Sequence, residues 1–157
     1  ASLLSDGVDD YLTVALSATN PTTQFFVYDK IGTGGNLGGL FNSANYAPAL
    51  AMNANGVYAY QSGPQFTPTY VNNNQSVVSL KSSTTGTDWA MWGNGASITN
   101  SGENIGVMSP TSLHLMSRGG ATLFANTYLQ EYIVYPSDQT SNQANIEDNI
   151  NTYYSIY

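Results

Sequence analysis

Residues 128–135 read Tyr128-Leu129-Gln130-Glu131-Tyr132-Ile133-Val134-Tyr135 and are followed by Pro136. This run is rich in aromatic and β-branched residues, which fit the pleated surface of a strand. It ends a series of short β-rich runs, separated by turn residues, that is typical of a β-sandwich or barrel. No strand alternates with a helix, so an α/β fold is not indicated. The expected strands cover residues 11–16, 24–31, 49–52, 57–61, 75–81, 88–93, 112–117, 122–124 and 128–135.

Glycine and asparagine mark the predicted connections. The stretch 32–39 holds five glycines and is expected to be a flexible turn or loop. Asn55-Gly56 lies between two expected strands and predicts a tight hairpin, because Asn and Gly tolerate positive φ. Residues 94–102 are turn-rich and polar, and we expect an irregular segment there.

After Pro136 the hydrophobic period changes from that of a strand to that of a helix. The spacing predicts one amphipathic helix over about residues 141–154, folded back against the sandwich. Ser137 or Asp138 can cap its N-terminus, and Glu147 and Asp148 are expected on its polar side. The apolar stripe of this helix is Ile146, Ile150, Tyr153 or Tyr154, and Tyr157.

Both ends of the chain resemble a known family. Residues 5–14 read Ser-Asp-Gly-Val-Asp-Asp-Tyr-Leu-Thr-Val, which resembles the "DGxDDY" opening strand of laminin-G-like, concanavalin-A-like domains. Residues 128–157 resemble their closing strand and terminal helix, and are similar to the ends of large extracellular and phage structural proteins. The resemblance implies an antiparallel two-sheet jelly-roll sandwich with one C-terminal amphipathic helix, formed by residues 1–157 as a single domain. It also implies an extracellular or virion-surface location.

In relatives of this kind, further sequence commonly precedes the opening strand, whereas here the chain starts at Ala1. A strand that is missing from the sandwich would leave an open edge. Such an edge is a template for pairing with another chain.

The charge composition excludes some partners. Only 8% of the residues are charged, against about 25% in typical proteins. With three Lys and Arg residues and a net charge of −7, the chain cannot neutralise a nucleic-acid backbone or an anionic membrane. No apolar run approaches the roughly 20 residues of a membrane span. The surface must instead be made of Ser, Thr, Asn, Gln, Gly and Tyr, which allows copies of the chain to pack closely with little repulsion.

Asp6, Asp9 and Asp10 are the densest carboxylate group. They could supply oxygens to Ca²⁺, which takes six to eight of them, and laminin-G-type domains often carry such a metal. The alternative is structural: Asp6-Gly7 forms a turn and Asp10 ties a loop to backbone amides. We favour the structural alternative and keep Ca²⁺ as a possible cofactor.

Aromatic and amide side chains suggest a sugar-binding platform, because sugars stack their C–H faces on rings and bond their hydroxyls to amides. Trp89 and Trp92 lie three apart on one expected strand and should point to opposite faces. We predict Trp89 in the core and Trp92 exposed beside the turn at residues 93–95. The predicted ligand-binding residues are Trp92, Asn94, Tyr58, Tyr60 and Tyr70.

The sequence does not favour an enzyme. Glycoside hydrolysis needs two carboxyl groups about 5–9.5 Å apart, and outside the first ten residues and the helix only Asp29, Asp88, Glu103 and Glu131 remain. Glu131 lies in the expected closing strand, where we expect a structural role. There is no cysteine, and the one histidine, His114, has no nucleophile elbow to serve. We expect no catalytic residues.

Two functions remain. The first is a carbohydrate-binding or adhesion module that binds a glycan or cell-surface polysaccharide. The second is a structural subunit that assembles with copies of itself, or with other domains, into a filament or capsid surface. A glycoside hydrolase is a distant third.

Overall fold

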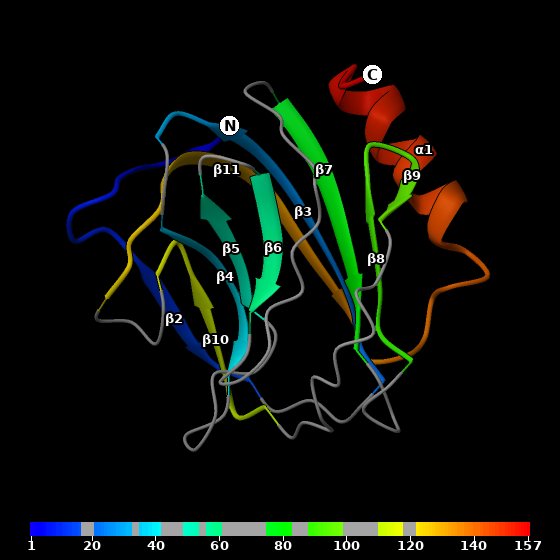
Figure 1. Ribbon diagram of the computed structural model, residues 1–157, viewed down its shortest axis with the longest axis horizontal. Coiled ribbons are helices and arrows are strands. Elements are labelled where there is room, and N and C mark those ends of the chain that lie inside the picture. The colour runs from blue at the N-terminus through cyan, green and yellow to red at the C-terminus, as the bar shows by residue number, and fades with distance from the viewer. Residues whose placement is uncertain are drawn as a thin grey trace.

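The computed structural model describes residues 1–16, 21–32, 35–41, 49–53, 56–60, 75–82, 88–98, 110–117 and 122–157. Within these residues the chain forms two antiparallel sheets that face each other, and one helix packed at the C-terminus (Figure 1). This confirms the predicted all-β sandwich with one C-terminal helix. Among the described residues, the helix does not have the length and hydropathy that a membrane span needs.

The larger sheet described has six strands in the order β1-β11-β3-β7-β8-β9. Strands β3 and β7 lie at its centre, and β11 pairs with β3 from Thr127 to Tyr135, apart from a bulge between Leu129 and Glu131. The strand bounds are β1 Leu3–Asp6, β3 Thr23–Lys30, β7 Gln75–Lys81, β8 Ala90–Gly93, β9 Ala96–Ile98 and β11 Asn126–Tyr135.

The smaller sheet described has five strands in the order β2-β10-β4-β5-β6. Strands β5 and β6 form the predicted hairpin, with Asn53 opposite Gly56, while Asn55 lies outside the described residues. The strand bounds are β2 Leu12–Ala15, β4 Asn36–Phe41, β5 Ala49–Asn53, β6 Gly56–Tyr60 and β10 Ser112–Leu115.

The main core lies between the two sheets. Phe26, Tyr28 and Leu80 come from the six-stranded sheet, and Leu50 and Leu113 from the five-stranded one. The alternation of side chains along β3 explains which of them enter this core. Phe26 and Tyr28 point inward, while Phe25 and Val27 point to the opposite face. Both faces of β3 are therefore buried, which accounts for its continuous apolar run.

Helix α1 (Gln143–Tyr154) covers the outer face of the six-stranded sheet. Ile150 on the helix joins Phe25, Val27 and Val77 in a second apolar cluster. Ile146 and Tyr154 pack against the same cluster, whereas the side chain of Tyr153 is 80% exposed. The sheet-facing stripe therefore contains Tyr154 and not Tyr153.

Two expectations for the helix are wrong. The helix begins at Gln143, and Asp138 instead accepts a hydrogen bond from the backbone of Thr140, in the turn before it. Glu147, expected on the polar side, is completely buried. Burial of this carboxylate is possible because Ser79 and Gly95, distant in sequence, donate hydrogen bonds to it.

The glycine-rich stretch is not wholly a loop, since Asn36–Phe41 forms β4. A Cβ at Gly38 would lie 2.0 Å from the backbone oxygen of His114, so close approach of β10 requires glycine at this place. Gly38 also ends the bulge between Asn36 and Gly38, and its φ of +107° is a backbone conformation that favours glycine.

Three other segments differ from expectation. Residues 96–98 of the expected irregular segment form β9, because Asn94 and Gly95 adopt positive φ and close a hairpin with β8. Residues 122–124 do not form a continuous strand, since Leu123 has φ of +51°. The "DGxDDY" motif is not a strand but the turn from β1 to β2, which belong to different sheets.

Candidate functional site

Trp89 lies in the core as predicted, whereas Trp92, which was predicted to be exposed, is half-buried. Trp89 is buried in the main core, at 4% exposure. Trp92 is half-buried on β8 and pairs in register with Ser79 and Ser97. Because Met91 points into the core, Trp92 points to the outer face of the six-stranded sheet, the face that carries α1.

Asn94 has a structural task beside Trp92. Its side-chain oxygen accepts a hydrogen bond from the backbone N–H of Val77 at 3.0 Å, and its backbone N–H donates to the Val77 carbonyl at 3.0 Å. Its φ of +47° belongs to the turn of the β8–β9 hairpin. The side chain of Asn94 is therefore already engaged in holding this hairpin to β7.

Two of the predicted tyrosines lie in the other sheet from Trp92 and Asn94. Tyr58 and Tyr60 lie on β6, in register with Ala51 and Ala49 of β5, in the five-stranded sheet. Tyr70 lies outside the described residues. Their role in ligand binding stays a prediction.

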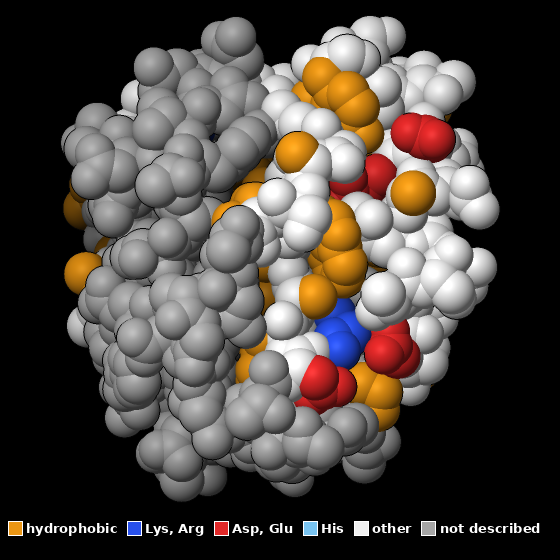
Figure 2. All heavy atoms as spheres, turned by 45° about the vertical axis from the view of Figure 1, so that its right-hand side comes forward, with side chains coloured by type: hydrophobic (Ala, Val, Ile, Leu, Met, Phe, Trp, Pro, Cys, Tyr) orange, Lys and Arg blue, Asp and Glu red, His pale blue; other side chains and the backbone are white. Residues whose placement is uncertain are grey.

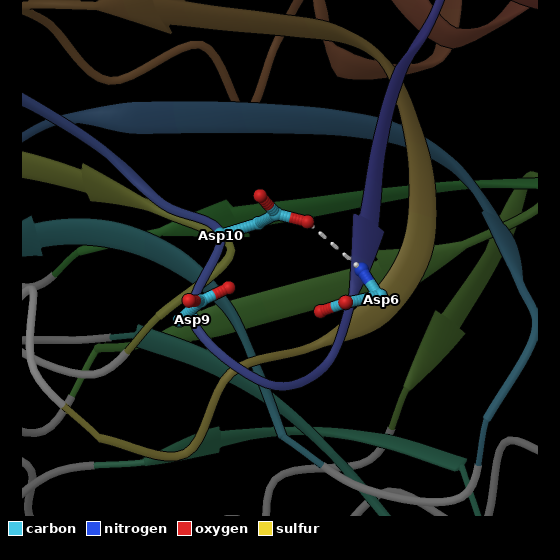
Figure 3. Close-up of side chains that lie close together, drawn as sticks. All are labelled: Asp6, Asp9 and Asp10. Atoms are coloured by element: carbon cyan, nitrogen blue, oxygen red, sulfur yellow. Dashed lines mark hydrogen bonds between the residues drawn. The ribbon is translucent and has the colours of Figure 1, made fainter.

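The three predicted acidic residues do gather. Carboxylate oxygens of Asp6, Asp9 and Asp10 lie within 4.8 Å of one another, in the exposed turn between β1 and β2 (Figure 3). Asp10 accepts a hydrogen bond from the backbone N–H of Asp6 at 3.2 Å, and Asp6 accepts one from the N–H of Val8 at 2.8 Å.

These hydrogen bonds are those of a self-contained turn. A Ca²⁺ ion requires six to eight oxygens, and two of the three carboxylates already serve backbone amides here. The cluster fits the structural alternative better than a resident calcium ion, and we derive no function from a metal at this turn.

A groove runs between α1 and the outer face of β11. It has a volume of about 440 Å³, within the range of about 300–1,000 Å³ found for ligand sites. One wall is formed by Glu131, Ile133 and Tyr135, which alternate along β11 and so share one face of the sheet. Glu131 was predicted to have only a structural role, but the structure places it at this groove.

The opposite wall is formed by the helix. Asn145, Asn149 and Tyr153 follow one another at intervals of four residues and so lie along one side of α1. All three are exposed, and within the described part of the chain the two amides have no hydrogen-bond partner. This i, i+4, i+8 series is visible in the sequence, but only the position of the helix shows that it faces a groove.

The groove also brings a carboxylate, that of Glu131, close to the phenol of Tyr154. Burial together with this neighbouring carboxylate raises the pKa of Tyr154. The rings of Tyr154 and Tyr153 meet edge to face, with centroids 4.8 Å apart. The phenol therefore stays neutral, and its contacts orient the exposed ring of Tyr153.

Glu147 fixes the helix that forms this groove. Its Oε1 accepts from Ser79 Oγ at 2.6 Å on β7, and its Oε2 accepts from Gly95 N–H at 2.9 Å in the β8–β9 turn. Burial raises the pKa of Glu147, which these hydrogen bonds partly oppose. One carboxylate thus ties α1 to two elements of the sheet.

His114 lies on β10, away from this groove in the other sheet. Its ring nitrogens are 2.9 Å from Ser112 Oγ and 3.1 Å from Thr13 Oγ1. Burial lowers its pKa, so the ring is neutral at neutral pH. These contacts are those of an ordinary strand histidine bonded to its neighbours.

The exposed surface of the described residues is weakly charged, as composition predicted. The side of the molecule shown in Figure 2 carries small, separate acidic and basic areas among uncharged atoms. Lys81, one of the three basic residues, is buried and pairs with Asp88 at 3.1 Å and Asp138 at 3.8 Å.

The two antiparallel sheets and the terminal helix define a concanavalin-A-like jelly-roll sandwich, the fold of many lectins, and solved structures of that fold match the chain. A heptameric SAP-like pentraxin from Limulus polyphemus matches with a TM-score of 0.65 and 14% identity, over 85% of this chain and 73% of that one. The CBM40 of the Ruminococcus gnavus IT-sialidase, bound to α2,3-sialyllactose, matches with 0.56 and 15%, over 92% and 97%. A tetrameric galectin from the ball sponge Cinachyrella sp. matches with 0.54 and 14%, over 80% and 99%.

Trypanosoma rangeli sialidase also matches, with a TM-score of 0.67 and 14% identity, but the chain spans only 26% of its length. At these identities the likeness shows the shared fold alone. No family model and no curated protein sequence matches the chain.

Proposed function

We propose that this chain is a non-catalytic carbohydrate-binding or adhesion module, folded as one sandwich over residues 1–157 and working outside the cell or on a virion surface. The observation that carries the proposal is the fold, shared over most of both chains with a pentraxin, a galectin and a CBM40 bound to a sialylated sugar. The tyrosine- and amide-lined groove adds chemistry that suits sugar hydroxyls and C–H faces.

A non-catalytic role is favoured by the places of the three described candidate carboxylates, while Glu103 lies outside the described residues. Asp88 is ion-paired with Lys81, and Asp29 lies in the middle of the sheet, in register with Gln75 and Tyr128. Glu131 lies beside Tyr154 in the groove between α1 and β11. Within the described residues, the one gathered acidic group is the Asp6, Asp9 and Asp10 turn.

A glycan array tests this function directly. We expect the purified chain to bind a defined set of glycans, and a parallel assay for sugar release from the bound glycans to stay negative. An array without signal would refute the proposal, and sugar release would refute its non-catalytic part.

A second candidate function is self-assembly, and one specific observation favours it. Strand β1 is the last strand of the six-stranded sheet and, among the described residues, pairs only with β11. Leu3 and Leu4 on this strand are 51% and 54% exposed, and β1 carries neither Lys nor Pro to protect its edge. Light scattering over a concentration series, with negative-stain images, tests it: a stable monomer at high concentration would exclude this function.

A further inference from the structure

We infer that the groove between α1 and β11 is a saccharide-binding site, and that it takes a neutral sugar. This inference rests on the proposed carbohydrate-binding function and gives it a place and a ligand class. It departs from the predicted site around Trp92, whose neighbouring amide, Asn94, is already engaged with β7.

The groove offers both kinds of contact that a sugar uses. The ring of Tyr153, 80% exposed, is a surface on which a C–H face can stack. The amides of Asn145 and Asn149 each present a carbonyl acceptor and an NH₂ donor, the complement of a hydroxyl that both donates and accepts. Because these amides have no partner among the described residues, binding a hydroxyl breaks no protein hydrogen bond.

The charge of the groove selects against anionic ligands. Glu131 is the charged residue of its lining, and none of the described lining residues is Lys, Arg or His. A carboxylated or phosphorylated sugar would meet this carboxylate without a compensating cation. A neutral saccharide can instead donate a hydroxyl hydrogen to Glu131.

The walls of the groove are held in place before any ligand arrives. Ile150 packs against Phe25, Val27 and Val77, and Glu147 bonds to Ser79 and Gly95. The helix wall and the sheet wall therefore keep their separation. A preformed site loses less entropy on binding than one that must assemble.

The test compares glycan arrays, followed by titration of the strongest neutral glycan, for the wild-type chain and four variants. Tyr153→Ala and the double variant Asn145→Ala/Asn149→Ala alter only exposed side chains of the groove and should fold normally. Tyr128→Ala is the matched control, because Tyr128 is an exposed tyrosine of β11 outside the groove. Trp92→Ala tests the rival site.

We expect neutral glycans to bind, Tyr153→Ala and the double variant each to weaken binding at least about tenfold, and Tyr128→Ala and Trp92→Ala to bind as the wild type does. Neutral-glycan binding that is unchanged in both groove variants, or lost only with Trp92→Ala, would overturn the groove site while leaving the proposed function intact. Binding confined to sialylated or phosphorylated glycans would overturn the neutral ligand class. A wild-type array without signal would instead refute the function itself.

Discussion

The outer face of the six-stranded sheet and the edge strands of the sandwich differ in how far they are covered. The outer face is covered by α1, whose polar anchor, Glu147, is fully hydrogen-bonded. The edge strands, β1 of the six-stranded sheet and β2 of the five-stranded sheet, carry Leu3, Leu12 and Val14, which remain between 43% and 51% exposed, although Leu3 and Val14 lie in register with core residues. The covered face retains a groove with both polar and apolar walls, suited to a small ligand, whereas the uncovered edge offers backbone and apolar side chains suited to another chain. The difference indicates that ligand recognition and self-association, if both occur, use separate surfaces.

The strongest way to break the covered face is to remove its anchor. Glu147→Ala leaves Gly95 N–H and Ser79 without their acceptor and opens a void at a buried place. We expect a loss of about 2–3 kcal/mol in the free energy of unfolding, because hydrogen bonds to a buried charged group are worth about that much. Urea unfolding measures it. Asp148→Ala, on the exposed neighbour in the helix, is the control and should change stability by less than about 0.5 kcal/mol. Equal effects of the two variants would contradict the anchoring role.

The same carboxylate predicts a pH dependence. Burial raises the pKa of Glu147 above its ordinary value of 4.5, so the unfolded chain loses this proton at lower pH than the folded chain does. The part of the stability that depends on this raised pKa is therefore complete below about pH 4.5 and is lost as pH rises through the folded-state pKa.

Comparison with Glu147→Gln isolates this effect, since lowered pKa values at Asp138 and His114 act with the opposite sign in both proteins. We expect the stability of the wild type relative to Glu147→Gln to fall as pH rises from about 4 to about 8. A constant difference, measured by urea unfolding at each pH, would show that the carboxyl group titrates normally.

The acidic turn at the uncovered edge should have a smaller effect. Asp10→Asn weakens one exposed hydrogen bond to the backbone of Asp6. We expect a loss of about 0.5–1 kcal/mol, as for a typical single hydrogen bond. Calcium should leave the melting temperature of both proteins unchanged. A calcium-dependent rise in Tm that Asp10→Asn abolishes would instead establish a metal site in this turn.

The smallest effect on stability should come from the edge strand itself. Leu4→Lys places a charge on an exposed position of β1 and should alter the free energy of unfolding by no more than about 0.5 kcal/mol. If copies of the chain associate through β1, however, this variant should dissociate them, because an edge lysine opposes strand pairing. Light scattering of wild type and variant decides: association that Leu4→Lys leaves intact would exclude this edge as the interface.

Much of the fold could be predicted because strands and helices are indicated by the pattern of residues that are neighbours in the sequence. The apolar runs in residues 24–31 and 75–81 identified β3 and β7 within one residue at each end, and the change of period after Pro136 identified the helix within two. Trp89 was correctly placed in the core. The binding site was predicted less well, because Asn94 proved to serve the hairpin and the groove residues lie on two elements that only the fold brings together.

By itself, then, the sequence determined the class of fold, the weakly charged surface and the existence of one amphipathic helix, since periodicity and composition are properties of a single segment or of the whole chain. The tertiary structure alone decided that the glycine-rich stretch enters a strand from Asn36 onward, because the approach of β10 to Gly38 is set by distant residues. It also decided that Glu147 is buried, because Ser79 and Gly95 satisfy it from other elements. The groove beside α1 also depends on the tertiary structure, because the exposed side of the helix forms a wall only where β11 lies opposite to it.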